Sequence, residues 1–278
     1  MITGAIGAGI ALGRTLSPRK PTQVQQLDVT DAAATAAALS TLVDSFASDP
    51  NMIAMAGSER ASHALVADMM EGNLKRATAP GRKPPLIFCT EGQVAVALSL
   101  RYPEEQPFYG GLTGILHVWP THWSTCSKTA HALREAHKAF EQQQGPHIHL
   151  LALTVAADQR GKGLGSRLLR HLASLADKEG LATYVEATSQ RNRALYLRHG
   201  FKDVQQVRVG SSKDEIVWFA MARQPRGSSR KAASPAKGNA ASPTSGQATS
   251  TTAGPANGGT NSQTNGKANG SLAMTTEQ

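Results

Sequence analysis

Apolar and polar residues alternate along residues 24–224 with two different periods, and these periods predict a chain built from both helices and strands. Apolar residues recur every three or four positions in five segments, at about 30–49, 58–76, 122–143, 163–178 and 191–199. Shorter apolar or alternating runs occupy 24–29, 86–90, 93–100, 147–155, 182–188, 201–209 and 215–221. We therefore expect one continuous α/β domain without an internal linker or repeat.

Local signals predict where these elements begin and end. Thr30 is the expected N-cap of the first, alanine-rich helix, because a hydroxyl there accepts a hydrogen bond from a first-turn amide. Asp49-Pro50 is expected to end that helix. Glu91-Gly92 predicts a short turn that joins two strands into a hairpin. The run 147–155 is almost wholly apolar, which predicts a strand buried on both faces.

Composition separates the two ends of the chain from this domain. Residues 225–278 consist mainly of Gly, Ala, Ser, Thr, Asn, Pro and Gln, and their only large apolar side chains are Leu272 and Met274. Such a segment buries too little apolar surface to offset its ordering entropy, so we expect a disordered tail at 225–278. Residues 1–23 are likewise predicted to be flexible, which leaves 24–224 as the folded domain.

The net charge of +9 is concentrated in the two tails. Arg14, Arg19 and Lys20 give +3 before Asp28, and five bases with one acid give +4 after Arg223, which leaves only +2 for the segment between them. A nucleic-acid surface would carry its bases on the folded domain, so we expect no nucleic-acid partner.

Cysteine content and the lengths of apolar runs bear on the remaining classes. Cys89 and Cys126 are too few for a disulfide scaffold or a cysteine zinc site. No apolar run approaches the length of a membrane span, so no membrane partner is expected. The first twenty residues contain Arg and Ser but no acid, as an organellar transit peptide would, yet they are glycine-rich and weakly amphipathic. We expect a cytoplasmic protein, with organellar import as the alternative.

A glycine-rich loop, Arg160-Gly161-Lys162-Gly163-Leu164-Gly165, joins the strand predicted at 147–155 to the following helix. Glycines let a backbone approach a ligand closely, and first-turn amides attract anions, so the loop suits a pyrophosphate with Arg160 and Lys162 as counter-charges. An ordinary strand-to-helix turn is the alternative. A P-loop would need Ser or Thr after Gly-Lys, whereas Gly163 follows Lys162. A Rossmann fingerprint needs a different glycine spacing and an acid after the next strand.

Arg160, Gly163 and Gly165 fit a further pattern: Arg or Gln, two residues, Gly, one residue, then Gly or Ala. Through this pattern the chain resembles the GNAT superfamily of acyl-CoA N-acyltransferases, and the likeness continues through NRALY at 192–196 and HGF at 199–201. SFASDP at 45–50 and the strand from His147 are similar to the puromycin N-acetyltransferase-like branch. The resemblance implies an α/β (α+β), GNAT-like domain with a mixed, mostly antiparallel sheet of six to seven strands flanked by helices.

The resemblance also implies acetyl-CoA as the acyl donor, no metal, and a role for each matching residue. The backbone of Leu153, Thr154 and Val155 would pair with the pantetheine arm. The amides of six consecutive residues would hold the pyrophosphate: Arg160, Gly161, Lys162, Gly163, Leu164 and Gly165. Asn192 would contact the donor, and Tyr196, one helical turn further on the same face, would protonate the departing CoA thiolate.

An amine attacks a thioester only after it loses a proton, so the reaction also needs a base. Glu186 in TYVEAT is the candidate, and a solvated or salt-bridged strand glutamate is the alternative, because the pattern does not determine its face. His147 and His149 share a strand face, but without a further ligand at suitable spacing we expect ordinary strand histidines. Trp119 and Trp123 either shape the acceptor pocket or simply pack.

The sequence therefore predicts an N-acetyltransferase that moves the acetyl group of acetyl-CoA directly to a primary amine of a small molecule, without a covalent intermediate. A protein or peptide N-acetyltransferase is one alternative. A non-catalytic acyl-CoA-binding module is the other. The expected assembly is a monomer or a homodimer.

Overall fold

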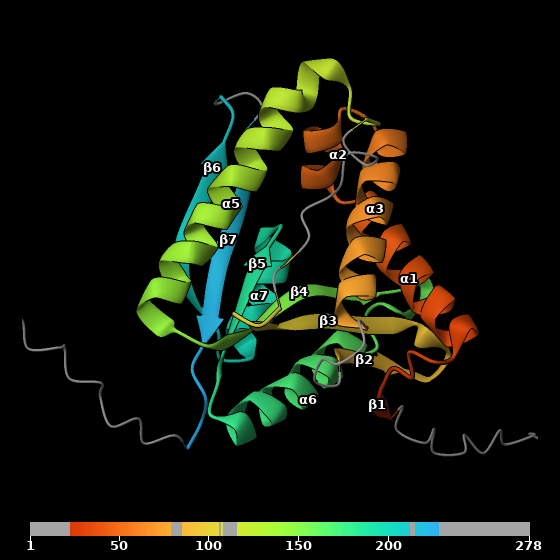
Figure 1. Cartoon of the computed structure of the whole chain (residues 1–278), viewed down its shortest axis with the longest axis vertical. Helices are drawn as coiled ribbons and strands as arrows, with labels where there is room; N and C mark the ends of the chain where they lie inside the picture. Colours follow the sequence, from red (N-terminus) through yellow and green to blue (C-terminus); the bar gives the residue numbers. More distant parts are fainter. Residues whose placement is uncertain (1–22, 79–84, 106, 108–115, 212–214, 228–278) are drawn as a thin grey trace, which may run out of the picture. The chain divides into compact units, whose positions relative to one another are not determined.

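The predicted strands and helices are all present in the computed structural model, which describes residues 23–78, 85–105, 107, 116–211 and 215–227 (Figure 1). All of these lie in the unit formed by residues 1–229. The strands are β1 (Val24–Gln26), β2 (Leu86–Thr90), β3 (Ala95–Tyr102), β4 (His147–Val155), β5 (Ala182–Ala187), β6 (Lys202–Val209) and β7 (Ile216–Arg223). The α-helices are α1 (Ala32–Ala47), α2 (Pro50–Ala56), α3 (Glu59–Ala77), α5 (Trp123–Gln144), α6 (Leu164–Glu179) and α7 (Gln190–Arg198). Short 3-10 helices are η1 (Glu91–Gln93), η2 (Pro120–His122) and η3 (Ala157–Gln159).

The described strands form one seven-stranded sheet in the order β1-β2-β3-β4-β5-β7-β6. Neighbouring strands are antiparallel except β4 and β5, which are parallel. The parallel pair follows from the crossover through α6, which returns the chain to the same end of the sheet. This confirms the predicted mixed, mostly antiparallel sheet of six to seven strands.

Alternate residues of β2 face two separate apolar cores. Ile87 and Cys89 pack in a core with residues of α1, α3 and α5, whereas Leu86 and Phe88 pack in a second core with residues of α6 and α7. In Figure 1, α1 and α3 lie on one side of β2–β4 and α6 lies on the other. Helices therefore cover both faces, which explains why the strand is buried at every position.

The N-cap of α1 differs from the prediction by one residue. Asp31, rather than Thr30, caps the helix: its carboxylate accepts hydrogen bonds from the amides of Ala33 (2.9 Å) and Ala34 (3.0 Å). The Thr30 hydroxyl instead donates to the carboxylate of Asp28 at 2.7 Å. A carboxylate and a hydroxyl are both good caps, so two adjacent candidates made the wrong choice possible.

Sequence reasoning missed α2 altogether. Asp49-Pro50 does follow the end of α1, but it also begins the next helix: the Asp49 carboxylate caps α2 by accepting a bond from the amide of Asn51, and Pro50 takes the first helical position. Proline suits that position because its missing N–H would have no partner there. The chain therefore makes a sharp corner at residues 48–50, between two helices.

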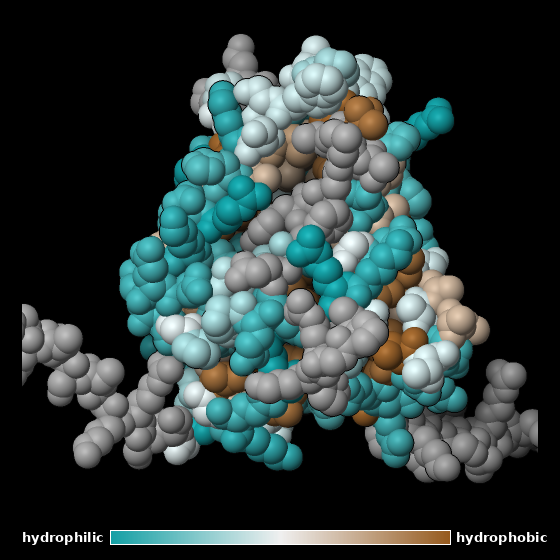
Figure 2. All heavy atoms as spheres, in the orientation of Figure 1, coloured by the Kyte–Doolittle hydropathy of each residue, from teal (hydrophilic) through white to brown (hydrophobic). Residues whose placement is uncertain are grey.

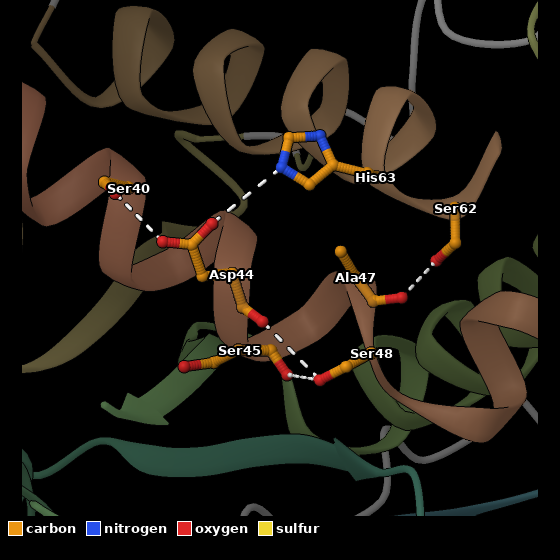
Figure 3. A network of polar contacts seen from close by, with 7 residues as sticks. All are labelled: Ser40, Asp44, Ser45, Ala47, Ser48, Ser62 and His63. Carbon is orange, nitrogen blue, oxygen red and sulfur yellow. Dashed lines mark hydrogen bonds and ion pairs between the residues drawn. The ribbon is translucent and has the colours of Figure 1, made fainter. Parts of the chain in front are cut away.

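Polar contacts between α1 and α3 hold this corner in place (Figure 3). The buried Ser62 hydroxyl of α3 donates to the carbonyl oxygen of Ala47, the last residue of α1, at 2.8 Å. In the last turn of α1, the Asp44 carboxylate lies 3.8 Å from His63 of α3 and accepts a bond from Ser40 at 3.0 Å. The end of α1 is thereby tied to a longer helix before the chain turns.

The remaining predictions concern the surface and the ends of the chain. Figure 2 shows hydrophilic side chains along the outward side of α5, as expected for an amphipathic helix. Within the described ranges, none of the helices combines the length and the apolar character needed to cross a membrane. The expected tails at 1–23 and 225–278 lie outside the described residues, apart from residue 23 and residues 225–227.

Candidate functional site

The two parallel strands separate part-way along their length. Hydrogen-bonded pairing between β4 and β5 covers only His147–His149 against Ala182–Tyr184. Beyond these pairs, β4 remains bonded to β3 and β5 to β7, but not to each other. A cavity of about 550 Å³ has the last three residues of β4 and the two residues after β5 in its wall, together with parts of α1, α2, α6 and α7.

A β-bulge lies in β4 just before it reaches this cavity. Leu98 of β3 pairs with Ala152, whereas the next residue, Ser99, pairs with Leu150, so Leu151 is an extra residue without a partner. A bulge bends its strand and increases the local twist. It therefore turns the end of β4 relative to the rest of the sheet, where the two strands part.

The loop after β4 brings backbone amides to the cavity wall. Gly161 and Gly163 have positive φ angles of 78° and 76°, which glycine adopts without the strain of a side chain. Gly163 occupies the N-cap position of α6, and no side chain caps that helix. Gly161, Gly163, Leu164 and Gly165 all line the cavity. Uncapped first-turn amides and the positive end of a 16-residue helix favour an anion at this place.

Three arginines and one acid give the wall its charge. Arg160, Arg191 and Arg198 line the cavity, and Asp49 is the acidic residue of the described wall. The Nε atom of Arg160 donates to the carbonyl oxygen of Val155 at 3.1 Å, which holds the guanidinium beside the end of β4. Sequence reasoning had not singled out Arg191 or Arg198, because exposed helical arginines carry no signal that separates binding from solubility.

Lys162 of the predicted loop lies apart from the wall. Its side chain is exposed and its Nζ atom donates to Oε1 of Gln159 at 2.8 Å. The other five residues from Arg160 to Gly165 do line the cavity, as do Leu153, Thr154, Val155 and Asn192. The structure therefore brings nine of the ten predicted donor-binding residues to one place.

Tyr196 reaches the cavity from α7 and is almost fully buried, with 6% of the residue exposed. Its ring packs against Phe201, with the ring centroids 5.4 Å apart. Burial raises the pKa of the Tyr196 phenol well above its ordinary value, and the negative charge of Glu186 raises it further. The phenol therefore keeps its proton at neutral pH and is chemically a proton donor.

Glu186 lies outside the cavity wall and forms a buried pair with His149. Its carboxylate oxygen Oε2 is 2.7 Å from Nε2 of His149, and the two side chains are 9% and 0% exposed. The other oxygen, Oε1, and the His149 Nδ1 atom have no hydrogen-bond partner among the described protein atoms. The contact with His149 is that of a paired strand glutamate, which was the alternative to a catalytic base. The negative charge of Glu186 nevertheless raises the pKa of Tyr196 in the cavity wall, so it acts close to the cavity.

His137 of α5 joins His147 and His149 in one buried cluster. The Nε2 atoms of His137 and His147 are 2.8 Å apart, and the ring of His137 lies 4.4 Å from that of His149. Burial lowers the pKa of His137 to about 2 and that of His147 to about 4, so both are neutral at physiological pH. Among the described residues, no group of three or more His, Cys, Asp or Glu side chains is arranged to hold a metal ion.

A corner of the wall was not anticipated from the sequence. It consists of the residues at the α1–α2 corner and those after β5: Ser45, Phe46, Ser48, Asp49, Pro50, Thr188 and Ser189. The sequence signal that could have pointed to Thr188 and Ser189 is that two small hydroxyl residues stand between a predicted strand and a predicted helix. Trp119 and Trp123 lie elsewhere, exposed by 56% and 47% and absent from the cavity wall.

Residues 125–201 match the model of the Acetyltransferase (GNAT) family, and this range includes β4, α6, β5 and α7. An uncharacterized N-acetyltransferase of Schizosaccharomyces pombe is 30% identical over 89 residues, which are 32% of this chain and 36% of that protein. The matched part thus spans about a third of the length of this curated relative.

Two solved structures share the fold at low sequence identity. Arylalkylamine N-acetyltransferase 7 of the yellow fever mosquito is 17% identical, with a TM-score of 0.50 over 72% of this chain and 86% of its own. A mosquito arylalkylamine N-acetyltransferase-like protein, 5b, is 14% identical, with a TM-score of 0.50 over 73% of this chain and 100% of its own. These likenesses concern the arrangement of strands and helices.

Proposed function

We propose that this chain is an acyltransferase of the GNAT acetyltransferase family, whose model residues 125–201 match, and that it transfers the acetyl group of acetyl-CoA to a primary amine of a small molecule. The observation that carries the proposal is the cavity between the separated ends of β4 and β5. Its wall combines the uncapped amides of α6, three arginines and the buried phenol of Tyr196. A polyanionic donor with a thioester at one end needs each of these groups.

The residues of the cavity suit the parts of acetyl-CoA. Amides of residues 163–165 and the guanidinium of Arg160 would hold the pyrophosphate, because a helix N-terminus and a cation both stabilise phosphate charge. The end of β4, at Leu153, Thr154 and Val155, has no partner strand on the β5 side, so the backbone groups that face that side can pair with the peptide-like pantetheine arm, beside the Val155 carbonyl oxygen that accepts from Arg160. The same backbone is our candidate for stabilising the oxyanion of the tetrahedral intermediate.

The chemical steps are assigned to two groups. Glu186 would take the proton of the amine, directly or through water, and His149 would hold the carboxylate in position. Tyr196 would then give its proton to the CoA thiolate as the carbon–sulfur bond breaks. The position of Tyr196 in the cavity wall supports this assignment, and its phenol is protonated at neutral pH, as a proton donor must be.

We place the acceptor among small amines and the chain in the puromycin N-acetyltransferase-like branch. The support for the branch is the SFASDP segment, five residues of which lie in the cavity wall: Ser45, Phe46, Ser48, Asp49 and Pro50. The two mosquito structures are named as arylalkylamine N-acetyltransferases, and an arylalkylamine is a small amine. At 17% and 14% identity they share only the fold with this chain.

A thiol-release assay with acetyl-CoA and a panel of amines and peptides tests the proposal. We expect CoA release that depends on one or more small primary amines. Release that depends only on peptides would indicate a protein or peptide acetyltransferase. Binding of acetyl-CoA without any release would indicate a non-catalytic acyl-CoA-binding module.

Replacing Tyr196 with Phe tests the proton donor. We expect kcat to fall by about a hundredfold, as for loss of a general acid, while the Kd of acetyl-CoA stays within about twofold. Tyr102→Phe is the matched control, because it removes a phenol hydroxyl away from the cavity wall, and its kcat should stay near that of the wild type. Equal losses of turnover and acetyl-CoA affinity in Tyr196→Phe would contradict the assigned role.

A further inference from the structure

Five hydrogen bonds form a network around the α1–α2 corner: three run from the corner to Thr188 and β7, one lies within the corner, and one continues from Thr188 to α7. The side-chain amide of Asn51 donates to the carbonyl oxygens of Thr188 (2.9 Å) and Val217 (2.8 Å). The Asp49 carboxylate accepts the Asn51 amide N–H at 2.9 Å and the Thr188 hydroxyl at 2.6 Å. Finally, Nδ2 of Asn192 lies 3.0 Å from the Thr188 hydroxyl oxygen.

The hydrogen bonds that connect Asn192, Thr188 and Asp49 can be directed in only one way. Asp49 as a carboxylate accepts but does not donate, so the Thr188 hydroxyl must give its single hydrogen to Asp49. The hydroxyl oxygen is then left to accept, and Asn192 must turn its NH₂ group toward Thr188. The carbonyl oxygen of the Asn192 amide is consequently the end that remains for a ligand.

We propose that Asp49 acts through Thr188 as a positioning residue for acetyl-CoA, by fixing the Asn192 side chain with its carbonyl oxygen available to accept an N–H from the amide-containing pantetheine arm. The inference rests on the proposed function and deepens it, since Asn192, Thr188 and Asp49 all line the same cavity. Thr188 is 8% exposed, which shields the chain from competition by water.

The same contacts explain how the cavity keeps its width. Thr188 follows the last residue of β5, where β4 no longer supplies hydrogen bonds. Its carbonyl oxygen accepts from Asn51 instead, and the second hydrogen of the same amide goes to β7. The α1–α2 corner thus supplies to the end of β5 the restraint that a neighbouring strand supplies elsewhere.

Thr188→Val tests the proposal, because it removes the hydroxyl and keeps the shape of the side chain. With CoA as the probe in calorimetry, we expect Kd to rise about tenfold, the loss of one to two buried hydrogen bonds, and kcat at saturating acetyl-CoA to change little. Thr188→Ser keeps the hydroxyl and should restore the wild-type Kd. An unchanged Kd in Thr188→Val, or a Kd in Thr188→Ser as high as that of Thr188→Val, would overturn the proposal.

Thr129→Val is the matched control for a purely structural loss. Thr129 is fully buried in α5 and its hydroxyl donates to the Thr125 carbonyl oxygen at 2.8 Å, so the variant also loses a threonine hydrogen bond, but away from the cavity. We expect it to leave the Kd of CoA unchanged. A tenfold rise in both valine variants would show that Thr188 acts only through stability, and the proposal would fail.

A double-mutant cycle distinguishes a chain of contacts from independent effects. Asp49→Ala breaks the same chain at its other end, and it should raise the Kd of CoA to a similar extent. Because either change alone frees Asn192, the double variant should bind CoA about as well as each single variant. Effects that multiply would contradict the coupling. If the wild-type chain itself does not bind CoA, the proposed function fails, whereas normal binding in all variants rejects the positioning role alone.

Discussion

The buried histidine cluster links the protonation of single residues to the stability of the domain. His137 and His147 are 3% and 0% exposed, and the Nε2 atoms that face each other can share only one hydrogen. Adding a proton to either ring would place a charge in an apolar, aromatic surrounding formed by Tyr102, Phe140 and Tyr184. The folded state therefore excludes a proton that the unfolded chain accepts readily.

Lowering the pH from 7 to 5 is expected to reduce the free energy of unfolding. The folded-state pKa values of His137 and His147, about 2 and about 4, lie below the ordinary histidine value of 6.5. Between these values the unfolded state binds more protons, so each histidine lowers the stability by up to about 1.4 kcal/mol for each pH unit below 6.5. Urea unfolding at the two pH values measures the loss.

A His137→Gln variant provides the control for this pH dependence. It should unfold with a shallower dependence on pH than the wild type between pH 7 and 5. Asp177 and Asp203, whose pKa values are lowered from 3.8 by hydrogen bonds from Arg223 and Arg193, keep their contribution until the pH falls below about 4. Identical pH dependence in wild type and variant would show that the cluster is not responsible.

At the scale of elements, α6 carries glycines with similar backbone conformations at its two ends. Gly163 at its N-cap has φ of 76° and Gly180 at its C-cap has φ of 67°, and a Cβ atom at either position would meet nothing within 4 Å. An alanine at either site therefore adds backbone strain without a steric clash. Only the N-terminal glycine lies in the cavity wall.

Gly163→Ala and Gly180→Ala should each lower the free energy of unfolding by about 1 kcal/mol, the cost of a side chain in the left-handed region. Only Gly163→Ala should also weaken CoA binding, by several-fold, because the strain is relieved by moving amides that line the cavity. Chemical unfolding and calorimetry measure the two effects. The same loss of CoA affinity in both variants would show that the loop at Gly163 does not bind the donor.

The elements that periodicity could predict are those whose apolar residues face one consistent neighbour. The leucines of α6, such as Leu168 and Leu172, recur at helical spacing because they pack on one sheet face. By contrast, α2 has only seven residues, too few for a repeating pattern, and its first residues resembled a helix stop. Its start at Asp49 became visible only with the hydrogen bonds around it.

The site residues that could be predicted are those in a local sequence pattern, and those that could not be predicted reach the site through long-range packing. The residues from Leu153 to Tyr196 that line the cavity lie within a short stretch of chain with a dense local pattern. Asp49 reaches the same wall through a bond to Thr188, which is 139 positions away. Such a contact depends on how the helices pack over the sheet, and no local spacing encodes it. The pairing of Glu186 with His149 was hidden for the same reason, since it joins neighbouring strands.

At the scale of the whole molecule, charge is distributed unevenly along the chain. The central segment, from Asp28 to Arg223, carries +2 of the net +9. Part of its charge is paired: Arg223 binds Asp177, Arg193 binds Asp203 and Arg101 binds Glu179. The arginines of the cavity wall are thus set in a segment that is otherwise nearly neutral, which favours a localised anionic ligand over an extended one.

A variant that ends at residue 227 tests this distribution. It loses four bases and one acid of the sequence and retains the sheet and the cavity. We expect the Kd of CoA to stay within about twofold, and any affinity of the full chain for a DNA duplex, with its steep salt dependence, to disappear. If the shortened chain still bound DNA tightly in a salt titration, the folded segment and not the C-terminal tail would carry the DNA-binding charge, contrary to this prediction.

The limited pairing of β4 and β5 has a consequence for how the sequence tolerates change. The cavity opens where hydrogen bonding between two backbones stops, and not where large side chains have been replaced by small ones. Substitutions in either apolar core that conserve volume therefore leave the opening in place, because they alter neither the bulge at Leu151 nor the end of the ladder at His149. Volume-conserving substitutions can therefore accumulate in the two apolar cores without closing the cavity.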